Sequence, residues 1–264
     1  MRDELIQLAE AAGRIGLGYF RGSVAAGVEE KGHLDLVTRA DREVEAFLVS
    51  ELRRLFPEDG IRGEEGASVH PQASRQWVID PIDGTFNFVR GMDPWAVSIG
   101  LYADGAPKFG VIHAPARGET LVGGPGGIVT MNGRPLPPLP PLDRRRGAIA
   151  VGFSTDTPVA KELAALRFIL EEMKFTYRHC GSTTAAFLML AEGQVDACLG
   201  FGVRSWDVMA GLPIVAGLDG ASTIDWTRSD LAQKFDYLAG SKEAVALALP
   251  ILSSSVAGSG SIPI

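Results

Sequence analysis

The spacing of hydrophobic residues divides the chain into a first part with helices and a strand meander, and a second part that alternates. Hydrophobic residues three and four apart predict helices over 5–19 and 38–56. Short apolar or alternating segments then predict a β-meander, with Asp104-Gly105 as a hairpin turn. Its predicted strands are 76–80, 97–101, 109–113 and 120–123.

A proline-rich segment separates this part from the next. Five of the seven residues from Pro135 to Pro141 are prolines, which predicts a stiff connector. We therefore place a domain boundary there, with an N-terminal α+β half over 1–140 and a C-terminal α/β half over 141–264. In the second half we predict strands over 148–153, 195–199, 223–226 and 237–239, and helices over 158–173, 182–191, 206–216 and 241–252.

Three details of the second half are specific enough to check. Thr157 is the predicted N-cap of the first helix, whose buried face would carry Val159, Leu163, Leu166, Leu170 and Met173. Pro213 predicts a kink in the helix over 206–216. The small and polar residues of the tail 253–264 predict little packing.

Composition and charge narrow the classes of protein. Hydrophobic residues make up 46% of the 264 residues, as in folded globular proteins. The formal net charge of −7 and the absence of a basic run disfavour nucleic-acid binding. No apolar run approaches 18 residues, so we expect no membrane partner. Two cysteines without C-x-x-C spacing and a charged, helix-periodic start predict a cytoplasmic location.

Two carboxylates stand at the end of the predicted strand 76–80. Asp80 and Asp83 flank Pro81 and precede Gly84, so both can converge on one point beyond the strand. Two anionic groups held so close repel unless a cation lies between them, and oxygen ligands of this kind suit Mg²⁺. The alternative interpretation is a plain Asp-Pro/Asp-Gly turn.

Further acidic residues are ambiguous one by one. Glu64, in Gly63-Glu64-Glu65-Gly66, fits a metal ligand or a solvated acidic loop. Asp207, after Trp206, fits a ligand or a helix N-cap. Asp41 lies three residues after Thr38 and fits a capping box.

The order of these fragments resembles the inositol monophosphatase family of Mg²⁺-dependent phosphatases. The resemblance runs from about residue 5 to about residue 250. It is carried by the segments 35–41, 63–65, 77–89, 181–182, 206–208 and 217–220.

The resemblance implies a layered αβαβα sandwich, as in inositol monophosphatase and fructose-1,6-bisphosphatase, with a site for two or three Mg²⁺. Carried over by position, Glu64, Asp80 and the carbonyl of Ile82 would bind the first metal, and Asp80, Asp83 and Asp207 the second. Glu64 would also hold a loosely bound third ion. Thr85, hydrogen-bonded to Asp41, would orient the attacking water together with Glu64.

The implied chemistry agrees with the charges. Hydrolysis of a phosphate monoester needs an activated water, neutralised phosphate oxygens and a stabilised leaving group, all of which paired metals supply. The side chains of Glu64, Asp80, Asp83 and Asp207 would be balanced by two Mg²⁺. The predicted substrate contacts are Asp83, Gly84, Thr85, Arg178, Gly181, Ser182, Thr183 and Asp207.

The substrate stays open at this point. Inositol-specific members carry a Glu seven residues before the Asp of the Trp-Asp motif, where this chain has Gly200. Arg204 would recognise an anionic or polar group, or is a solvated surface residue. The segment Asn87-Phe88-Val89-Arg90-Gly91 resembles the histidinol-phosphate phosphatases of the same superfamily. Inositol-1-phosphate, histidinol phosphate, a sugar bisphosphate and a nucleotide 3′-phosphate are the candidates.

The resemblance also bears on partners and inhibition. It implies a homodimer that hydrolyses a small phosphorylated alcohol and is sensitive to lithium. A different class of function is a regulatory binding protein in a transcription complex, since some bacterial relatives act in that way.

Overall fold

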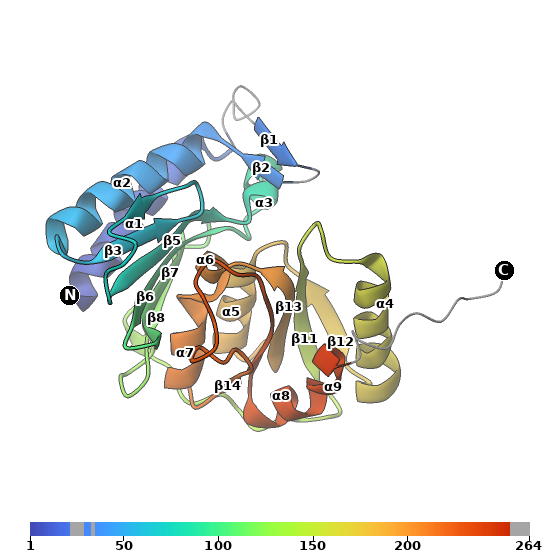
Figure 1. The fold of residues 1–264 in the computed structure, drawn as a ribbon. Coiled ribbons are helices and arrows are strands. Elements are labelled where there is room, and N and C mark those ends of the chain that lie inside the picture. The colour runs from blue at the N-terminus through green and yellow to red at the C-terminus, as the bar shows by residue number, and fades with distance from the viewer. Residues whose placement is uncertain (22–28, 33–34, 254–264) are drawn as a thin grey trace.

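The protein is a sandwich of five layers in the order αβαβα (Figure 1). The computed structural model describes residues 1–21, 29–32 and 35–253, of which 29–32 and 35–37 are described by their backbone alone. The prediction that the tail 253–264 packs little falls, from residue 254 on, outside the described residues. The layered architecture predicted above is confirmed.

The first sheet holds the predicted meander. It has eight strands in the order β10-β9-β8-β7-β6-β5-β3-β4, and its neighbours from β5 to β10 are antiparallel. A separate hairpin pairs β1 (Glu29–Gly32) with β2 (Asp35–Val37). The strands of the sheet are β3 (Gly60–Gly63), β4 (Ser68–Val69), β5 (Gln76–Asp83), β6 (Ala96–Ala103), β7 (Ala106–Ala114), β8 (Glu119–Gly123), β9 (Thr130–Met131) and β10 (Arg134–Pro135).

Strand β3 was not predicted from the sequence, although it lies next to β5, the strand that carries Asp80 and Asp83. It is four residues long, begins and ends with glycine, and pairs in parallel with β5. With so few side chains it carries no periodic pattern. Its last residue, Gly63, delivers Glu64 to the end of β5.

Two helices cover the outer face of this sheet. They are α1 (Arg2–Tyr19) and α2 (Arg39–Leu55), close to their predicted bounds. Leu5, Leu48 and Leu52 of these helices pack on Trp77 and Ile99 of the sheet. The burial of one apolar stripe explains why the three-four spacing predicted both helices correctly.

The second sheet has five strands in the order β12-β11-β13-β15-β14. Between the two sheets lie α5 (Thr183–Ala191), α6 (Ser205–Val208) and α7 (Gly211–Gly217), whose side chains join both sheets in one hydrophobic core. The strands are β11 (Ala148–Phe153), β12 (Thr176–His179), β13 (Ala197–Val203), β14 (Ala221–Ser222) and β15 (Phe235–Gly240). The outer layer consists of α4 (Val159–Arg167), the π-helix η1 (Phe168–Met173), α8 (Lys242–Ala248) and α9 (Pro250–Ser253).

The predicted buried face of the first helix in this half was wrong for three of its five residues. Val159, Leu163 and Leu170 are 67%, 60% and 49% exposed. Met173 is buried and Leu166 packs against the core as predicted, and Ala165 and Ile169 complete the buried face. The α-helix changes to a π-helix at Phe168, which shifts the register of its last turn. Thr157 does not cap the helix, because its hydroxyl bonds to Ser154 and to the carbonyl of Phe201.

Three other boundaries differ from the prediction. The helix over 206–216 is divided into α6 and α7 between Val208 and Gly211, and Pro213 lies in the first turn of α7, where its missing N–H costs nothing. The helix over 241–252 is likewise divided, before Pro250. In place of the predicted strand over 223–226, the described structure has β14 over Ala221–Ser222, and at Thr223 the backbone N–H donates to the Leu238 carbonyl while the hydroxyl accepts the N–H of Leu238.

The proline segment joins the two sheets. Strands β3 to β10 belong to the first sheet and those from β11 on to the second. Leu136 and Leu139 of this segment pack against the shared core, and Leu139 N–H donates to the carbonyl of Leu218. The two halves that this connector joins therefore pack into one shared core. The exact domain boundary stays a prediction.

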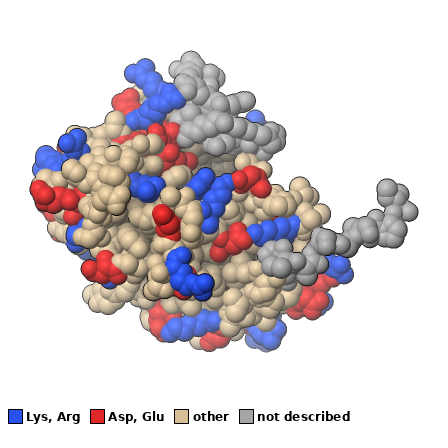
Figure 2. Space-filling model, viewed as in Figure 1, with Lys and Arg blue, Asp and Glu red and all other residues tan. Residues whose placement is uncertain are grey.

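The surface and the helices give two further findings. Basic and acidic side chains are interspersed over the described part of the face seen in Figure 2. Among the described residues, no helix combines the length and apolar character needed to cross a bilayer.

Candidate active site

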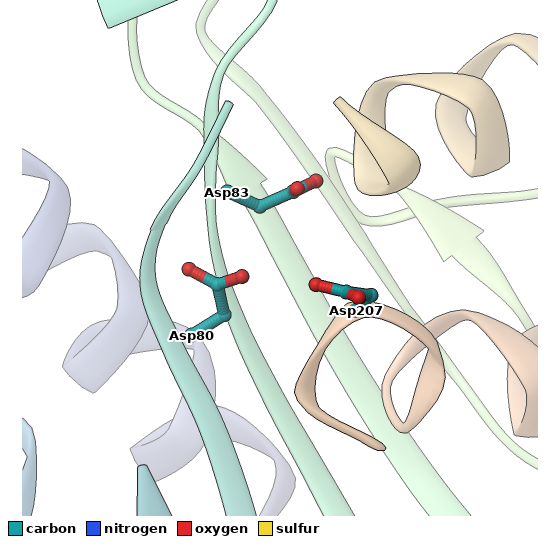
Figure 3. A group of neighbouring side chains, drawn as sticks. All are labelled: Asp80, Asp83 and Asp207. Carbon is teal, nitrogen blue, oxygen red and sulfur yellow. The ribbon is translucent and has the colours of Figure 1, made fainter. Parts of the chain in front are cut away.

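Three aspartates from the two halves of the chain meet at the end of β5 (Figure 3). Asp80 and Asp83 come from β5 and Asp207 from α6, and their carboxylates point toward a common space. One carboxylate oxygen of each lies within 4.8 Å of one oxygen of each of the others. This set of close oxygen ligands is the kind that Mg²⁺ binds, and it fits the predicted metal site.

A bulge at Pro81 brings Asp80 and Asp83 to the same side of the sheet. Residues three apart in a regular strand point to opposite faces. Here Asp80 stands opposite Ser98 and Asp83 opposite Ala96, so three steps along β5 correspond to two along β6. The extra residue changes the alternation, and both carboxylates lie close to that of Asp207.

Glu64 joins this group through the loop after β3. Its carboxyl group is hydrogen-bonded to Asp80, and its N–H donates to the carbonyl of Ile79 at 3.3 Å. The loop is fastened by Glu45 of α2, whose carboxylate accepts the N–H groups of Glu65 at 2.8 Å and Ala67 at 3.0 Å. Sequence analysis did not single out Glu45. The available signal was a glutamate within the buried stripe of an amphipathic helix.

Asp41 combines the two roles that the sequence left as alternatives. One of its oxygens, Oδ2, accepts from the N–H and the hydroxyl of Thr38 and completes the capping box of α2. The other, Oδ1, lies 3.4 Å from the hydroxyl of Thr85, which also lies 3.2 Å from the carbonyl of Ile82. Capping therefore holds Asp41 in the position from which it can orient Thr85.

The N-terminus of α5 surrounds Asp83 with donors. The carboxylate accepts from the Ser182 hydroxyl at 2.7 Å, the Thr183 N–H at 3.3 Å and the Thr184 N–H at 2.5 Å. The Thr184 hydroxyl also donates to it. Thr184 is fully buried and was not among the predicted site residues. Its position in an apolar helix pattern conceals this contact.

Gly84 permits the close approach of α5 to the end of β5. Its φ of +92° lies in the left-handed region, and a Cβ there would come within 2.9 Å of the Ser182 Cβ. Asn87 strengthens the same junction by donating to the carbonyls of Pro94 and Cys180. Gly84 and Gly181 thus shape the turns that bring β5 and α5 together.

Burial and mutual repulsion raise the pKa values of the carboxylates. Burial, followed by the charges of Glu64, Asp83 and Asp207, raises the pKa of Asp80 well above its usual value. Burial and the charge of Asp83 raise the pKa of Asp207 to about 7, against the N–H of Arg204. For Asp83, burial outweighs the donors of α5 and its pKa is also raised. A bound cation would relieve this repulsion, so the cluster favours cation binding.

These carboxylates open into a cleft of about 540 Å³ between the two halves of the chain. Glu64, Asp83 and Asp207 line it, as do Gly181, Ser182 and Thr183. Arg178 is not brought there: its guanidinium bonds to the Thr176 hydroxyl and the Tyr177 carbonyl. Other lining residues are His179, Arg204, Trp206, Lys234 and Tyr237.

The fold and the site together define the class: an αβαβα sandwich with a cluster of carboxylates where its two halves meet. The sequence matches the inositol monophosphatase family over residues 1–256. The chain belongs to this family, whose members are metal-dependent phosphatases that typically use Mg²⁺. The family predicted from the motifs is thus confirmed.

Individual relatives differ in their named activities. The chain is 34% identical over 203 residues to a fructose-1,6-bisphosphatase/inositol-1-monophosphatase of Thermotoga maritima, with 74% of each chain covered. It is 31% identical over 217 residues to a histidinol-phosphatase of Chlorobaculum parvum, with 80% of each covered. The crystal structure of the extragenic suppressor protein suhB from Bartonella henselae superposes with a TM-score of 0.85 at 27% identity, covering 94% of this chain and 97% of that one.

The contact of Thr184 with Asp83 leads to a prediction about metal affinity. Thr184→Val removes one hydroxyl donor but keeps the shape of the side chain, so Asp83 is held less firmly. Loss of such an outer partner of a metal ligand typically costs about 10- to 100-fold in affinity. We expect this loss for Mg²⁺ in calorimetric titration of the metal-free protein. Thr184→Ser, which keeps the hydroxyl, serves as the control, and equal affinities of all three proteins would contradict the prediction.

Proposed function

We propose that this protein hydrolyses a small phosphate monoester with the help of Mg²⁺ and an activated water molecule. The observation that carries the proposal is the convergence of Asp80, Asp83 and Asp207 beside a cleft that Glu64, Asp83 and Asp207 line. These four side chains and the carbonyl of Ile82 would hold two or three Mg²⁺. When bound, Mg²⁺ supplies Lewis acidity and positive charge at the phosphate and the attacking water.

The protein's own groups position the reactants. The Thr85 hydroxyl has Asp41 and the Ile82 carbonyl as acceptors, so its oxygen lone pairs are directed to accept a hydrogen bond from water. Burial raises the pKa of Asp41 to about 6, and the bonds from Thr38 counteract this rise. Glu64 would accept the proton of the water. The N–H groups of Gly84 and Thr85, with Ser182 and Thr183, would bind the ester.

A phosphate-release assay on the purified protein tests this function. We expect release from at least one of inositol-1-phosphate, histidinol phosphate, fructose-1,6-bisphosphate and adenosine 3′-phosphate in the presence of Mg²⁺. Release should stop in EDTA and return when Mg²⁺ is added. No Mg²⁺-dependent release from any ester would reject the proposal and favour a regulatory binding role.

Histidinol phosphate is the second candidate substrate, beside inositol-1-phosphate. The relative from Chlorobaculum parvum named histidinol-phosphatase supports it, as does the Asn87-Phe88 pair noted above. In the structure Asn87 joins α3 (Thr85–Val89) to the loop before α5, next to the cleft. The same panel of esters distinguishes inositol-1-phosphate from histidinol phosphate by their kcat/KM values.

Lithium gives an independent prediction. If Li⁺ takes the place of one Mg²⁺ after hydrolysis and slows the release of phosphate, inhibition should be uncompetitive toward the ester. We expect this pattern at Li⁺ concentrations in the millimolar range, measured by steady-state kinetics at fixed Mg²⁺, with K⁺ at equal ionic strength as the control. Competitive inhibition by Li⁺, or none, would contradict it.

A further inference from the structure

A second pocket, here named the outer pocket, lies between α1 and the first sheet and has a volume of about 560 Å³. Its helical side includes Glu10 and Arg14, and its strand side includes His113, Thr120 and Thr130. None of the residues that line it also lines the cleft beside the carboxylates. The volume is that of a site for a small molecule.

The first sheet separates the outer pocket from the carboxylates. Val97 on β6 stands opposite His113 on β7 and packs with the residues of α1 and α2. The preceding residue, Ala96, stands opposite Asp83 and packs in the core between the two sheets. Because successive residues of a strand point to opposite faces, His113 and Asp83 lie on opposite sides of the sheet. A ligand in the outer pocket would therefore leave the place of the phosphate ester open.

Glu10 and Arg14 bring opposite charges to the outer pocket without neutralising each other. They lie one turn apart on α1, a spacing at which an acidic side chain commonly pairs with a basic one. Here no ion pair joins them, and neither side chain makes a hydrogen bond or an ion pair with any other described residue. Both charges are therefore open to a ligand.

His113 adds a buried polar group to the same pocket. Its side chain is 8% exposed, and Nδ1 lies 2.9 Å from the hydroxyl of Thr120. The other ring nitrogen, Nε2, has no hydrogen-bond partner among the described residues, and it is not one of the sealed unpartnered atoms such as Trp95 Nε1. Gly13 of α1 leaves room for it, since a Cβ there would lie 2.8 Å from Nε2. Burial lowers the pKa of His113 against the charge of Glu10, so the ring is neutral near pH 7.

Hydrogen bonds fix the strand side of the outer pocket. Asn132 Oδ1 accepts the N–H of Thr120 at 2.7 Å, and its Nδ2 donates to the carbonyl of Gly118 at 3.0 Å. Arg2, at the start of α1, donates to the hydroxyl of Thr130 at 2.7 Å. This wall is therefore ordered before a ligand binds, which lowers the entropic cost of binding.

We propose that the outer pocket binds a free α-amino acid, with Arg14 at its carboxylate, Glu10 at its ammonium group and His113 Nε2 as a further hydrogen-bond partner. The inference goes beyond the proposed phosphatase function and does not depend on it. A simple anion would be repelled by Glu10 and a simple cation by Arg14, whereas a zwitterion is attracted by both. Ile6 and Val122 offer apolar surface to the side chain of the amino acid.

Thermal unfolding of the full chain in Mg²⁺ with each of the common L-amino acids tests the proposal. The one that raises Tm most is then titrated by calorimetry, with an expected dissociation constant on the order of 0.1–1 mM for so small a ligand. Its amine without the carboxylate and its acid without the amino group should each bind at least about tenfold more weakly, the effect of one charged hydrogen bond. No rise in Tm with any amino acid, or equal binding of the two analogues, would overturn the inference.

Variants of the two charged residues locate the ligand. Glu10→Gln and Arg14→Gln should each weaken binding about tenfold, with little change in Tm without the ligand, because neither side chain is buried or paired. Glu4→Gln is the matched control, on the same helix but outside the pocket lining, and should keep the affinity. Binding that survives both pocket variants, or that is lost in Asp207→Asn, would overturn the inference. Phosphate release without added amino acid tests the phosphatase function separately, so either proposal can fail alone.

Discussion

Asp207→Asn is expected to abolish Mg²⁺-dependent phosphate release while the fold stays intact. Asparagine keeps the size of the side chain but removes one of three charges that lie within 4.8 Å of one another. Loss of an outer partner of a metal ligand costs about 10- to 100-fold, and loss of a ligand itself should exceed this. Asp80→Asn should have the same effect, because Asp80 is buried between Glu64, Asp83 and Asp207.

The stability of these variants distinguishes a metal site from a structural role. In the metal-free protein the removed charge relieves repulsion, so thermal unfolding should occur at the same or a higher temperature. Asp104→Asn is a matched control, since Asp104 lies in an exposed hairpin turn with φ of +49°, a conformation that asparagine tolerates. Full activity of Asp207→Asn would remove the metal assignment, and a loss of folding would show a structural role instead.

The metal-free protein is expected to lose stability as the pH rises from 5.5 to 8. The pKa of Asp207 is about 7 in the folded protein, against 3.8 for the unperturbed group, and that of Asp80 is raised as well. Between these values the folded state binds more protons than the unfolded state, so the free energy of unfolding falls with increasing pH. The loss of unfolding free energy is complete above the pKa of the folded state, and for Asp207 it is on the order of 1–4 kcal/mol.

Thermal unfolding in EDTA at several pH values measures this effect. A fall in Tm of about 5 °C or more over the range follows from the size of the chain. Asp207→Asn should flatten the curve, and saturating Mg²⁺ should do so in the unchanged protein, since the cation balances the charges. A Tm in EDTA that rises over this range, or a fall in Asp207→Asn that is as steep as in the unchanged protein, would contradict the assignment.

The acidic residues of the site could be found from the sequence because their signals are local. A buried strand that ends in Asp-Pro-Ile-Asp-Gly, a Gly-Glu-Glu loop and a Trp-Asp pair are each contiguous, and their order matched one family. Helices α1 and α2 and the meander were predictable for the same reason, since each buries a single face with a regular period.

Predictions failed where a distant contact replaces the local pattern. The apolar residues Val159, Leu163 and Leu170 follow a helical period, yet the π-helix and the core turn other residues inward. The expected strand over 223–226 ends at Ser222, because at Thr223 the N–H of Leu238 bonds to the side-chain hydroxyl in place of a backbone carbonyl. Neither event leaves a mark in the sequence near the residues concerned.

By itself the sequence determined which residues can carry charge to the site, because a carboxylate, a turn-forming glycine and a helix period are properties of neighbouring residues. The tertiary structure decided how those charges are held and what lies opposite them. The bulge at Pro81 aligns Asp80 with Asp83, Thr184 donates to Asp83 across 101 positions of sequence, and Tyr237 covers Gly200 from another strand. These contacts join residues far apart along the chain, so their geometry exists only once the two sheets and the helices between them have packed.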